Sequence, residues 1–489
     1  MPDRETTKRL STGVAGLDEV LYGGLLPQRS YLVRGAAGTG KTTLGFHFLT
    51  AGAAHGVPTL YITLGQREAG IRQDAQGLGL DLTGIPVLDL SPTPEFFTKV
   101  KTYDIFTPGD VEREPITQKI IEQVEQHKPR RVFVDAITQF RHLASDSQQF
   151  HKQTLAFLNY LTEKQATVLF TSESSRATPD DDLQFHSDGI ITLGVTEHGR
   201  TLKVSKFRGS GFQEGRHALR ITDQGLVVYP RLLPEAHRQP FVLEMIPSGI
   251  ATFDAVLHGG VERGTTTLIT GPSGVGKTTM ALHFVNEAAK RGEHSVVYVL
   301  EEPLSILTTR CEALQIPMRA MIEKGLVSLF QVEPHRYMPE EFVQIVRQEV
   351  EQRQARLVMI DSIAAYRKFL RGDDLLTDLH VLCQYLQNMG VKILLTNEVE
   401  QVAGGFQATE YGVSYLAGNI IYLRYMERRT KDGALEIGRC VGVLKKRLTD
   451  FEKTVRELEI TGEGMKVGEP IIGLQGVLST MPVVDERQA

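Results

Sequence analysis

TGVAGLDEVLYGGLLPQRSYLVRGAAGTGKTTLGFHFL (residues 12–49) and SGIATFDAVLHGGVERGTTTLITGPSGVGKTTMALHFV (residues 248–285) decide the fold of this 489-residue chain. The two stretches align without a gap, with Asp18 on Asp254 and Lys41 on Lys277. Self-similarity at a fixed spacing is the signature of a repeat architecture. Units this long are whole domains and not solenoid repeats, so the sequence predicts two copies of one domain.

Later landmarks recur in the same order in both halves. RVFVD (131–135) corresponds to RLVMID (356–361), and ATVLFTSE (166–173) corresponds to VKILLTNE (391–398). Strands that are apolar throughout and alternate with helical stretches indicate a parallel sheet buried on both faces. We therefore predict an α/β protein of two tandem domains, residues 1–238 and 239–489, joined in the proline-bounded stretch 230–240.

Each copy contains a glycine-rich loop of the form GxxxxGK[ST], at residues 35–42 and 271–278. Each loop follows an apolar strand, Tyr31–Arg34 or Thr266–Thr270, and opens a helix, which is the context that gives this motif its meaning. The glycines let backbone N–H groups turn toward a phosphate, and the helix N-terminus adds partial positive charge. The predicted nucleotide contacts are Gly38, Thr39, Gly40, Lys41, Thr42 and Thr43, and Gly274, Val275, Gly276, Lys277, Thr278 and Thr279.

The same loops predict a bound Mg²⁺. Thr42 and Thr278 follow the loop lysines, and Asp135 and Asp361 end the apolar strands that recur downstream. In phosphate-loop enzymes a hydroxyl and a strand-end aspartate in these positions hold Mg²⁺ beside the β- and γ-phosphates. A strand-end aspartate alone is often only a turn former, but its repetition downstream of each loop favours the metal role. ATP and Mg²⁺ are the predicted cofactors, and no histidine spacing indicates a further metal.

The halves differ just after the strand that follows the phosphate loop. The second half has Glu301-Glu302 where the first has Gly65-Gln66. A carboxylate in this place can orient the attacking water or accept its proton. A solvated pair of acidic residues is the alternative interpretation. We predict that Glu301 and Glu302 are catalytic and that the first domain binds ATP but hydrolyses it slowly, with Glu68 the nearest substitute base.

Taken together, TGVAGLDEVLYGG, the paired phosphate loops, EEP (301–303) and the basic tripeptides KFR (206–208) and KKR (445–447) resemble KaiC-like proteins of the RecA superfamily. The resemblance covers the chain from about residue 10 to about residue 480. It implies two RecA-like domains, a hexamer with ATP between protomers, and cations that reach the neighbour's γ-phosphate. Those cations are Lys206, Arg208, Lys445 and Arg447. An exposed basic edge strand is the alternative explanation of each tripeptide.

The resemblance also suggests autophosphorylation, because the clock KaiC phosphorylates an adjacent serine and threonine in its second domain. Ser414 matches the serine, within TEYGVSYL (409–416), while Tyr415 replaces the threonine. A tyrosine hydroxyl lies farther from the backbone and does not share the same in-line geometry. We predict phosphorylation of Ser414 with Glu301 as base; a serine in a subunit-contact loop is the alternative. The missing glutamate pair in the first domain favours a KaiC-like regulator in signalling or stress response over a self-sustained oscillator.

The bulk composition limits partners and location. The net charge of −5 gives no electrostatic argument for nucleic acid, and no aromatic-plus-basic strand suits single-stranded DNA. Cys311, Cys383 and Cys440 lack metal or disulfide spacing, and no signal peptide or membrane-length apolar run is present, so we expect a cytoplasmic protein. We expect a homo-oligomer with a regulatory protein partner, and we expect the run Asp180–Asp182 to be solvated surface. A DNA-repair or recombination ATPase, or a scaffold that binds ATP only to hold its rings together, are the competing functions.

Overall fold

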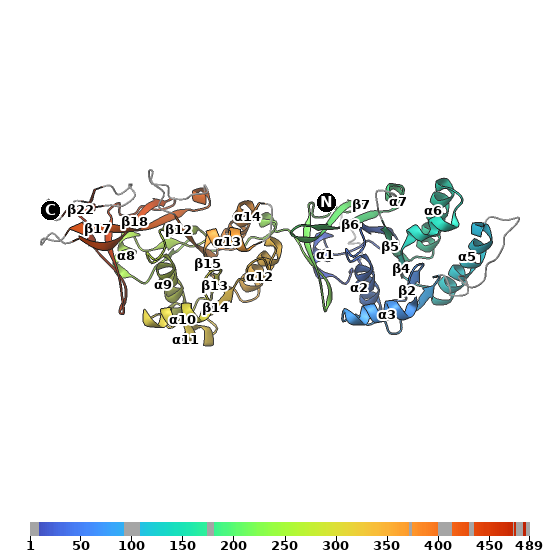
Figure 1. The fold of residues 1–489 in the computed structure, drawn as a ribbon, viewed down its shortest axis with the longest axis horizontal. Helices are drawn as coiled ribbons and strands as arrows, with labels where there is room; N and C mark the ends of the chain where they lie inside the picture. Colours follow the sequence, from blue (N-terminus) through green and yellow to red (C-terminus); the bar gives the residue numbers. More distant parts are fainter. Residues whose placement is uncertain are drawn as a thin grey trace. The chain divides into compact units, whose positions relative to one another are not determined.

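The computed structural model describes residues 9–91, 108–173, 180–370, 374–399, 413–429, 435–472, 474–475 and 483–485. Contacts within the chain divide it into two compact units, Met1–Arg231 and Leu232–Ala489, each drawn in Figure 1. In each unit helices cover a mostly parallel sheet, which confirms the predicted α/β class with two tandem RecA-like domains. The domain limits 1–238 and 239–489 stay a proposal.

The first unit has a nine-stranded sheet among the residues that the structure describes, in the order β3-β2-β4-β5-β1-β6-β7-β8-β9. The pairs from β3 to β6 are parallel, and the pairs from β6 to β9 are antiparallel. The strands are β1 (Ser30–Gly35), β2 (Thr59–Thr63), β3 (Val87–Asp89), β4 (Arg131–Asp135), β5 (Thr167–Glu173), β6 (Gly189–Thr196), β7 (Gly199–Phe207), β8 (His217–Thr222) and β9 (Gly225–Tyr229).

Helices cover both faces of this sheet. They are α1 (Ala15–Val20), α2 (Lys41–Ala53), α3 (Glu68–Gly77), α5 (Pro108–His127), the 3₁₀ helix η1 (Ile137–Leu143), α6 (Ser147–Glu163) and α7 (Asp181–His186). One core cluster joins α1, α2 and α3 to the sheet, and a second joins α5, α6 and α7 to it. Apolar side chains on both faces of the central strands explain why those strands read as continuous hydrophobic runs.

The second unit repeats the architecture in the order β14-β13-β15-β16-β12-β17-β18-β19-β20. Among the described residues, β22 also pairs with β17 and with β21, and β10 pairs with β11. The strands are β10 (Met245–Ile246), β11 (Val261–Glu262), β12 (Thr266–Gly271), β13 (Ser295–Val299), β14 (Val327–Gln331), β15 (Leu357–Asp361), β16 (Lys392–Glu398), β17 (Asn419–Arg429), β18 (Leu435–Lys446), β19 (Arg456–Thr461), β20 (Gly464–Pro470), β21 (Leu474–Gln475) and β22 (Val483–Asp485).

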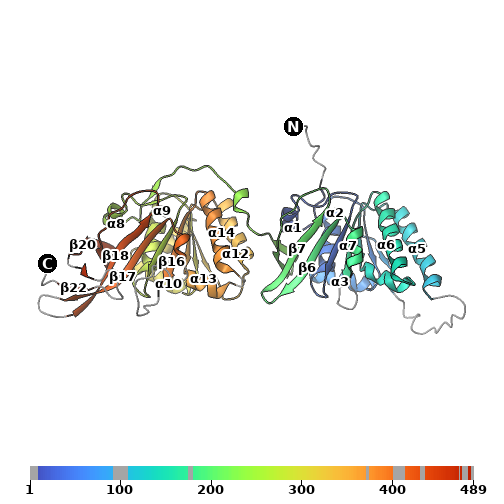
Figure 2. The ribbon, with the colours of Figure 1, turned by 90° about the horizontal axis from the view of Figure 1, so that it is seen from above.

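The helices of the second unit again cover both faces, as the turned view in Figure 2 shows. They are η2 (Pro234–Ala236), α8 (Ala251–Val256), α9 (Lys277–Lys290), α10 (Leu304–Ala313), α11 (Met318–Glu323), α12 (Pro339–Glu351), α13 (Ile363–Phe369), α14 (Leu375–Asn388) and η3 (Val413–Tyr415). Helices α13 and α14 begin at capping residues, since Ser362 and Asp374 accept backbone N–H groups from the first turn.

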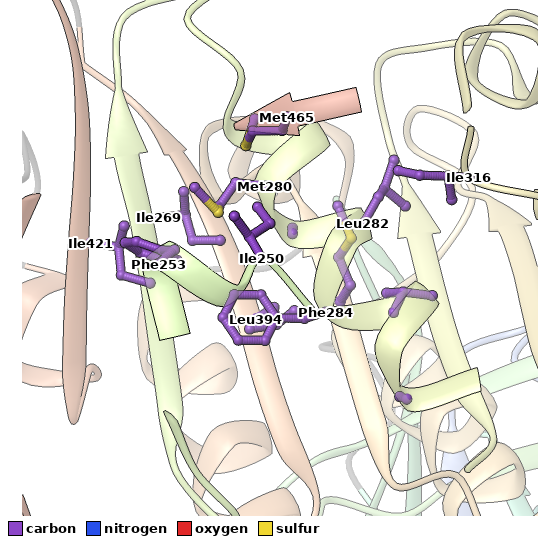
Figure 3. Close-up of a cluster of buried hydrophobic side chains, with 14 of the residues drawn as sticks. Ile250, Phe253, Ile269, Met280, Leu282, Phe284, Ile316, Leu394, Ile421 and Met465 are labelled. Atoms are coloured by element: carbon purple, nitrogen blue, oxygen red, sulfur yellow. The ribbon is translucent and has the colours of Figure 1, made fainter. Parts of the chain in front are cut away.

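The core under the second phosphate loop is drawn in Figure 3. Met280 and Phe284 of α9 point toward Ile269 of β12 and Leu394 of β16, and all four are buried. A helix whose first turn follows the phosphate loop is therefore fixed on the sheet by its apolar side chains. This packing holds the loop at the carboxyl end of β12.

The segment before β10 packs on the second unit. Leu232 belongs to the core cluster of α12, α13 and α14, and Asn388 Nδ2 donates to the Pro234 carbonyl at 2.8 Å. The His237 ring meets the Tyr385 ring edge to face, with centroids 5.3 Å apart. Residues 232–239 are thus an ordered part of the second unit.

Candidate functional site

Both phosphate loops adopt a backbone that only glycine accepts without strain. The residues before α2 and α9, Gly40 and Gly276, have φ angles of 104° and 115°. A Cβ on Gly276 would lie 2.5 Å from Ile460 Cδ1, so close packing adds to the requirement. Thr39 and Val275 are buried beneath their loops, which leaves their backbone N–H groups as the groups able to meet a phosphate.

The loop lysines lie inside their loops. Lys41 Nζ donates to the carbonyls of Gly35 and Ala36 at 2.8 and 3.0 Å, and Lys277 Nζ donates to the Pro272 carbonyl at 2.7 Å. Burial lowers the pKa of both lysines, and nearby carboxylates partly oppose that shift. Two buried cations at loop centres are well placed to meet phosphate oxygens.

The residues predicted to hold Mg²⁺ lie together in both units. Thr42 Oγ1 donates to Asp135 Oδ2 at 2.7 Å, and Thr278 Oγ1 donates to Asp361 Oδ2 at the same distance. The other oxygen of each aspartate accepts from a threonine of the adjacent strand, Thr171 or Thr396. A hydroxyl and a carboxylate oxygen side by side are hard ligands of the kind that Mg²⁺ prefers.

A cavity of about 540 Å³ opens beside the loop of the second unit. Its lining brings together Lys277, Thr278, Thr279 and Asp361 with Glu301 and Glu302. Glu302 Oε2 accepts from Arg310 Nη2 of α10 at 2.8 Å, while Glu301 makes no hydrogen bond or ion pair within the described chain. Glu301 is therefore the carboxylate that is free to act on a bound molecule, and Glu302 is fixed by Arg310.

The corresponding loop of the first unit offers no such carboxylate. Gly65 and Gln66 follow β2, and the Gln66 carbonyl accepts from Thr63 Oγ1 at 2.9 Å. Glu68 pairs with Arg72 of α3 at 2.7 Å, and Arg72 also donates to the Leu82 carbonyl at 2.7 Å. Glu68 is thus committed to a contact within its own helix.

Two glutamates at strand ends escaped the sequence prediction. In the parallel register Glu173 lies opposite Gly35, and Glu398 lies opposite Gly271, the first glycine of each loop. Their charges act on the pKa of Lys41 and Lys277 in the direction that opposes burial. The signal was present, because TSE and TNE end the two repeated strands, but nothing in the sequence indicated which loop they face.

An arginine beside each loop was also missed. Arg200 Nε donates to the Gly38 carbonyl at 3.2 Å, and Arg439, six residues before Lys445 as Arg200 is before Lys206, lines the cavity of the second unit. Arg439 lies over the Tyr425 ring at 5.7 Å. The available signal was an arginine that stands six residues before the first lysine of each basic tripeptide.

The four predicted interface cations lie toward the opposite end of the strands from the phosphate loop of their own unit. Lys206 pairs with Ile190, which is level with Leu32 of β1, and Lys445 pairs with Ile420, which is level with Leu268 of β12. Three residues of strand, roughly 10 Å, separate these levels from Gly35 and Gly271. The cations therefore do not reach their own phosphate loop.

Both cation strands carry a register shift at the same place. The β6–β7 ladder shifts between Ile190 and Ile191, and the β17–β18 ladder shifts between Ile420 and Ile421. A bulge re-aims the side chains next to it and is common beside active sites. Each shift lies directly at the predicted cation, Lys206 or Lys445.

Main-chain oxygens at this end of the strands hold the two lysines. Lys206 Nζ donates to the Gln184 carbonyl at 2.7 Å, and Lys445 Nζ donates to the Ser414 and Ala417 carbonyls at 3.1 and 2.8 Å. Burial lowers the pKa of each lysine, and the neighbouring Arg208 or Arg447 lowers it further. Arg208 lies 3.9 Å from Asp188 and has a side chain that is 58% exposed.

Ser414 lies in η3 beside Lys445, because its carbonyl accepts from the lysine ammonium. Tyr415 is 49% exposed, and its ring lies 5.4 Å from the ring of His380 on α14. Residues 409–412 of the same predicted stretch lie outside the described residues.

The expectation that Asp180–Asp182 is solvated surface is wrong. Asp180 is fully buried, and it accepts from Arg34 Nη2 and from Ser172 Oγ. Asp182 accepts two hydrogen bonds from Arg141, both at 3.0 Å. Only Asp181 keeps a largely exposed side chain. The carboxylates of Asp180 and Asp182 thus neutralise two arginines from distant parts of the first unit, Arg34 and Arg141.

The fold and the paired loops define a tandem P-loop ATPase. A family model described as "ATPase: KaiC" matches residues 10–232 and again residues 246–471. The chain belongs to the KaiC family of ATPases.

Several relatives are similar over nearly the whole chain. Circadian clock oscillator protein KaiC 1 of Synechocystis sp. is 26% identical, over 99% of this chain and 94% of that protein. Circadian clock oscillator protein KaiC of Picosynechococcus sp. is 25% identical, over 98% and 94%. KaiC of Synechococcus elongatus is 24% identical, over 99% and 94%. Within the described part of the chain, no helix combines the length and apolar character that crossing a bilayer requires.

Proposed function

We propose that this ATPase binds ATP and Mg²⁺ in both units, that its chemistry takes place in the second, and that its nucleotide state regulates a protein partner. The observation that carries the proposal is the cavity in which Glu301 faces Lys277, Thr278 and Asp361. The first unit has Gly65 at the position of Glu301. The predicted role of the first unit is therefore slow turnover and assembly.

Hydrolysis follows from these positions. The loop of residues 274–279 would bind the phosphates through backbone N–H groups and Lys277, and Thr278 with Asp361 would hold Mg²⁺, which would neutralise phosphate charge. Glu301 takes a proton from water as the water oxygen bonds to the γ-phosphorus, and the bond to the β-phosphate oxygen breaks to leave ADP. Glu302, paired with Arg310, keeps the loop of Glu301 in place.

The cations support a ring of protomers. The four predicted cations lie toward the end of the strands away from their own phosphate loops, so they can contact a phosphate only in a neighbouring protomer. They are Lys206, Arg208, Lys445 and Arg447. A cation supplied in trans stabilises charge on the transferring phosphoryl group. A hexamer with ATP between protomers, as the family resemblance implies, is the proposed assembly.

Autophosphorylation of Ser414 is the finer part of the proposal. Ser414 lies at the same edge as Lys445, so its hydroxyl would meet the ATP of a neighbouring protomer and not its own. The serine oxygen attacks the γ-phosphorus, the partner's Glu301 takes the hydroxyl proton, and ADP leaves. The output in signalling, stress response or timing, and the cytoplasmic location, remain predictions from the sequence and the family.

The test compares wild type, Lys41→Ala and Glu301→Gln for ATP turnover and for phosphate incorporation, with mass spectrometry of the peptide that contains Ser414. We expect Glu301→Gln to abolish turnover and incorporation, and Lys41→Ala mainly to disturb assembly. Unchanged turnover in Glu301→Gln would refute the division of labour. Incorporation of no phosphate at Ser414 would refute the autokinase alone. Stimulation by single-stranded DNA would favour a repair ATPase instead.

A further inference from the structure

The first unit has a carboxylate of its own at the phosphate loop. Glu173 ends β5, the strand between β4, which carries Asp135, and β1, which leads into the loop. In the parallel register it lies opposite Gly35. Within the described part of the chain, its carboxylate makes no hydrogen bond or ion pair, whereas Glu68 pairs with Arg72. The carboxylate of Glu173 is therefore available to a molecule bound at this loop.

Strand geometry places the Glu173 side chain on the same face as the predicted metal site. Thr171 Oγ1 donates to Asp135, whose other carboxylate oxygen accepts from Thr42 Oγ1 at 2.7 Å. Side chains two residues apart on a strand share a face and are separated by about 6–7 Å along it. Glu173 therefore projects from the same face as Thr171, one such step nearer the end of the sheet where the phosphate loop lies.

The environment of the loop lysine also indicates that this carboxylate is close. Lys41 Nζ donates at 2.8 Å to the carbonyl of Gly35, the residue opposite Glu173. Burial lowers the pKa of Lys41, and Glu173 opposes that shift more strongly than Asp135 or Asp180. A loop lysine of this kind meets the β- and γ-phosphates. The charge of Glu173 thus acts at the ammonium group expected to bind the transferring phosphoryl group.

An amide group lies where the first unit lacks its glutamate. Gly65 stands at the position of Glu301, and Gln139 Nε2 lies 4.0 Å from the point that a Cβ at residue 65 would occupy. Gln139 belongs to η1, and its neighbour Thr138 accepts the Glu173 backbone N–H at 3.5 Å. A glutamine amide can orient a water for attack on a γ-phosphate but has no basic oxygen to take its proton. A nearby carboxylate is needed for that step.

We propose that Glu173 is the proton acceptor for ATP hydrolysis in the first unit, and that Gln139 orients the attacking water. The proposal rests on the proposed function, because it supplies the base for the slow turnover assigned to this unit. As the water oxygen bonds to the γ-phosphorus, a water proton passes to the Glu173 carboxylate. The bond from the γ-phosphorus to the bridging oxygen breaks, and that oxygen keeps the electron pair as part of ADP. The proton on Glu173 then returns to solvent.

The test uses the full-length chain with the second unit silenced by Lys277→Ala, so that residual phosphate release reports the first unit. In this background Glu173→Gln should lower turnover at saturating ATP at least about tenfold, and Glu173→Asp, which keeps a carboxylate, should lower it less. Gln139→Ala introduces the residue that the second unit has at the aligned position, Ala365, and should lower turnover about three- to tenfold. Glu163→Gln, at the exposed end of α6, is the matched control and should leave turnover unchanged.

Two further readouts do not depend on turnover. After incubation with ATP, the nucleotide that remains bound is identified by chromatography, and we expect Glu173→Gln to retain ATP where the parent chain holds a larger share of ADP. The affinity for a non-hydrolysable ATP analogue should not weaken, because the substitution removes a negative charge beside the phosphates. The Glu173 side chain is exposed, so the substitution removes no core contact.

Several results would overturn the proposal. One is unchanged turnover and unchanged bound nucleotide in Glu173→Gln, and another is loss of turnover in Glu68→Gln in its place. Weaker binding of the analogue by Glu173→Gln, in proportion to the lost turnover, would assign Glu173 a structural role instead. Absence of residual turnover in Lys277→Ala with ATP bound would show that the first unit has no working base. The proposed function fails separately, through unchanged turnover when Glu301→Gln is made in the otherwise intact chain.

Discussion

Introducing a carboxylate into the first unit tests the proposed division of labour by a gain of ATP hydrolysis. The variant is Gly65→Glu in a chain whose second unit is silenced by Lys277→Ala. Gly65 stands at the position of Glu301, and the two preceding strands have equivalent registers, Thr63 opposite Asp135 and Val299 opposite Asp361. A Cβ on Gly65 would meet only Gln139 Nε2, at 4.0 Å, so the backbone site accepts a side chain without a clash at its Cβ.

The expected gain follows from what the new glutamate has and lacks. A positioned general base contributes roughly 10²- to 10⁴-fold to rate. The second unit also fixes its glutamate loop through Glu302 and Arg310, whereas Asp74 takes the position of Arg310 on α3. Without that anchor the installed carboxylate is less well oriented, so we expect a gain of about 10- to 100-fold, equal to roughly 1.4–2.7 kcal/mol in the barrier.

The assay is phosphate release by the full-length protein at saturating ATP. Gly65→Gln in the same Lys277→Ala background is the matched control, because it adds the same volume without a basic oxygen. ATP binding and oligomer size are measured for both variants. Equal turnover in the Glu and Gln variants, with binding and assembly intact, would refute the reasoning and would return attention to Glu173, which lies opposite Gly35.

Three further perturbations follow from particular contacts. Asp180→Asn leaves Arg34 without its buried partner and should destabilise the first unit by about 3–5 kcal/mol, measured by urea unfolding; an unchanged midpoint would contradict this. Burial lowers the pKa of His283 from 6.5 to about 4, so its contribution to stability is complete above pH 6.5 and is lost as the pH falls toward 4. In His283→Leu, the free energy of unfolding should fall less between pH 6.5 and pH 4, by up to about 3 kcal/mol. Unfolding curves at several pH values across this range measure the effect, and an unaltered pH slope would show that other groups cause the acid dependence. Lys445→Ala and Lys277→Ala should each abolish turnover in the second unit, but mixed rings should regain it, because one variant supplies intact loops and the other intact cations; no recovery on mixing would exclude catalysis in trans.

The fold was predictable from the sequence because its deciding features are short in range. A glycine-rich loop needs its glycines within eight residues, and the strand before it and the helix after it are adjacent in sequence. The hydroxyl and aspartate of each predicted metal site are 93 or 83 residues apart, and they were predictable because the repeat preserves both landmarks in order. In the structure Thr42 and Asp135 do lie together.

What the sequence could not supply is the pairing of distant segments. Asp180 looked like solvated surface because its partner Arg34 is 146 residues away, and only the approach of α7 to the end of β1 joins them. Glu173 and Glu398 meet the loops through strand register, which a single sequence does not specify. Arg200 reaches Gly38 across 162 residues through the β6–β7 hairpin. These contacts depend on sheet order and not on local pattern.

The strands that carry Lys206 and Lys445 have the same backbone arrangement in the two units, but the buried side chains beneath them differ in chemistry. The middle residue of each basic tripeptide faces the core, because side chains alternate along a strand. In the first unit this residue is Phe207, which stacks on Tyr31 with centroids 5.6 Å apart. In the second it is Lys446, whose fully buried ammonium lies 3.6 Å from Glu262 and donates to the Leu257 carbonyl.

This difference changes what holds the cations in place. An aromatic stack tolerates small shifts, whereas a buried lysine must keep its carboxylate and carbonyl partners or carry an uncompensated charge. The strand that presents Lys445 is therefore held to one register more strictly than the strand that presents Lys206. A strict register is what a catalytic cation requires, since misplacement by about 1 Å is enough to slow a reaction a hundredfold. The buried pair beneath Lys445 and the carboxylate of Glu301 thus both support the proposal that the chemistry takes place in the second unit.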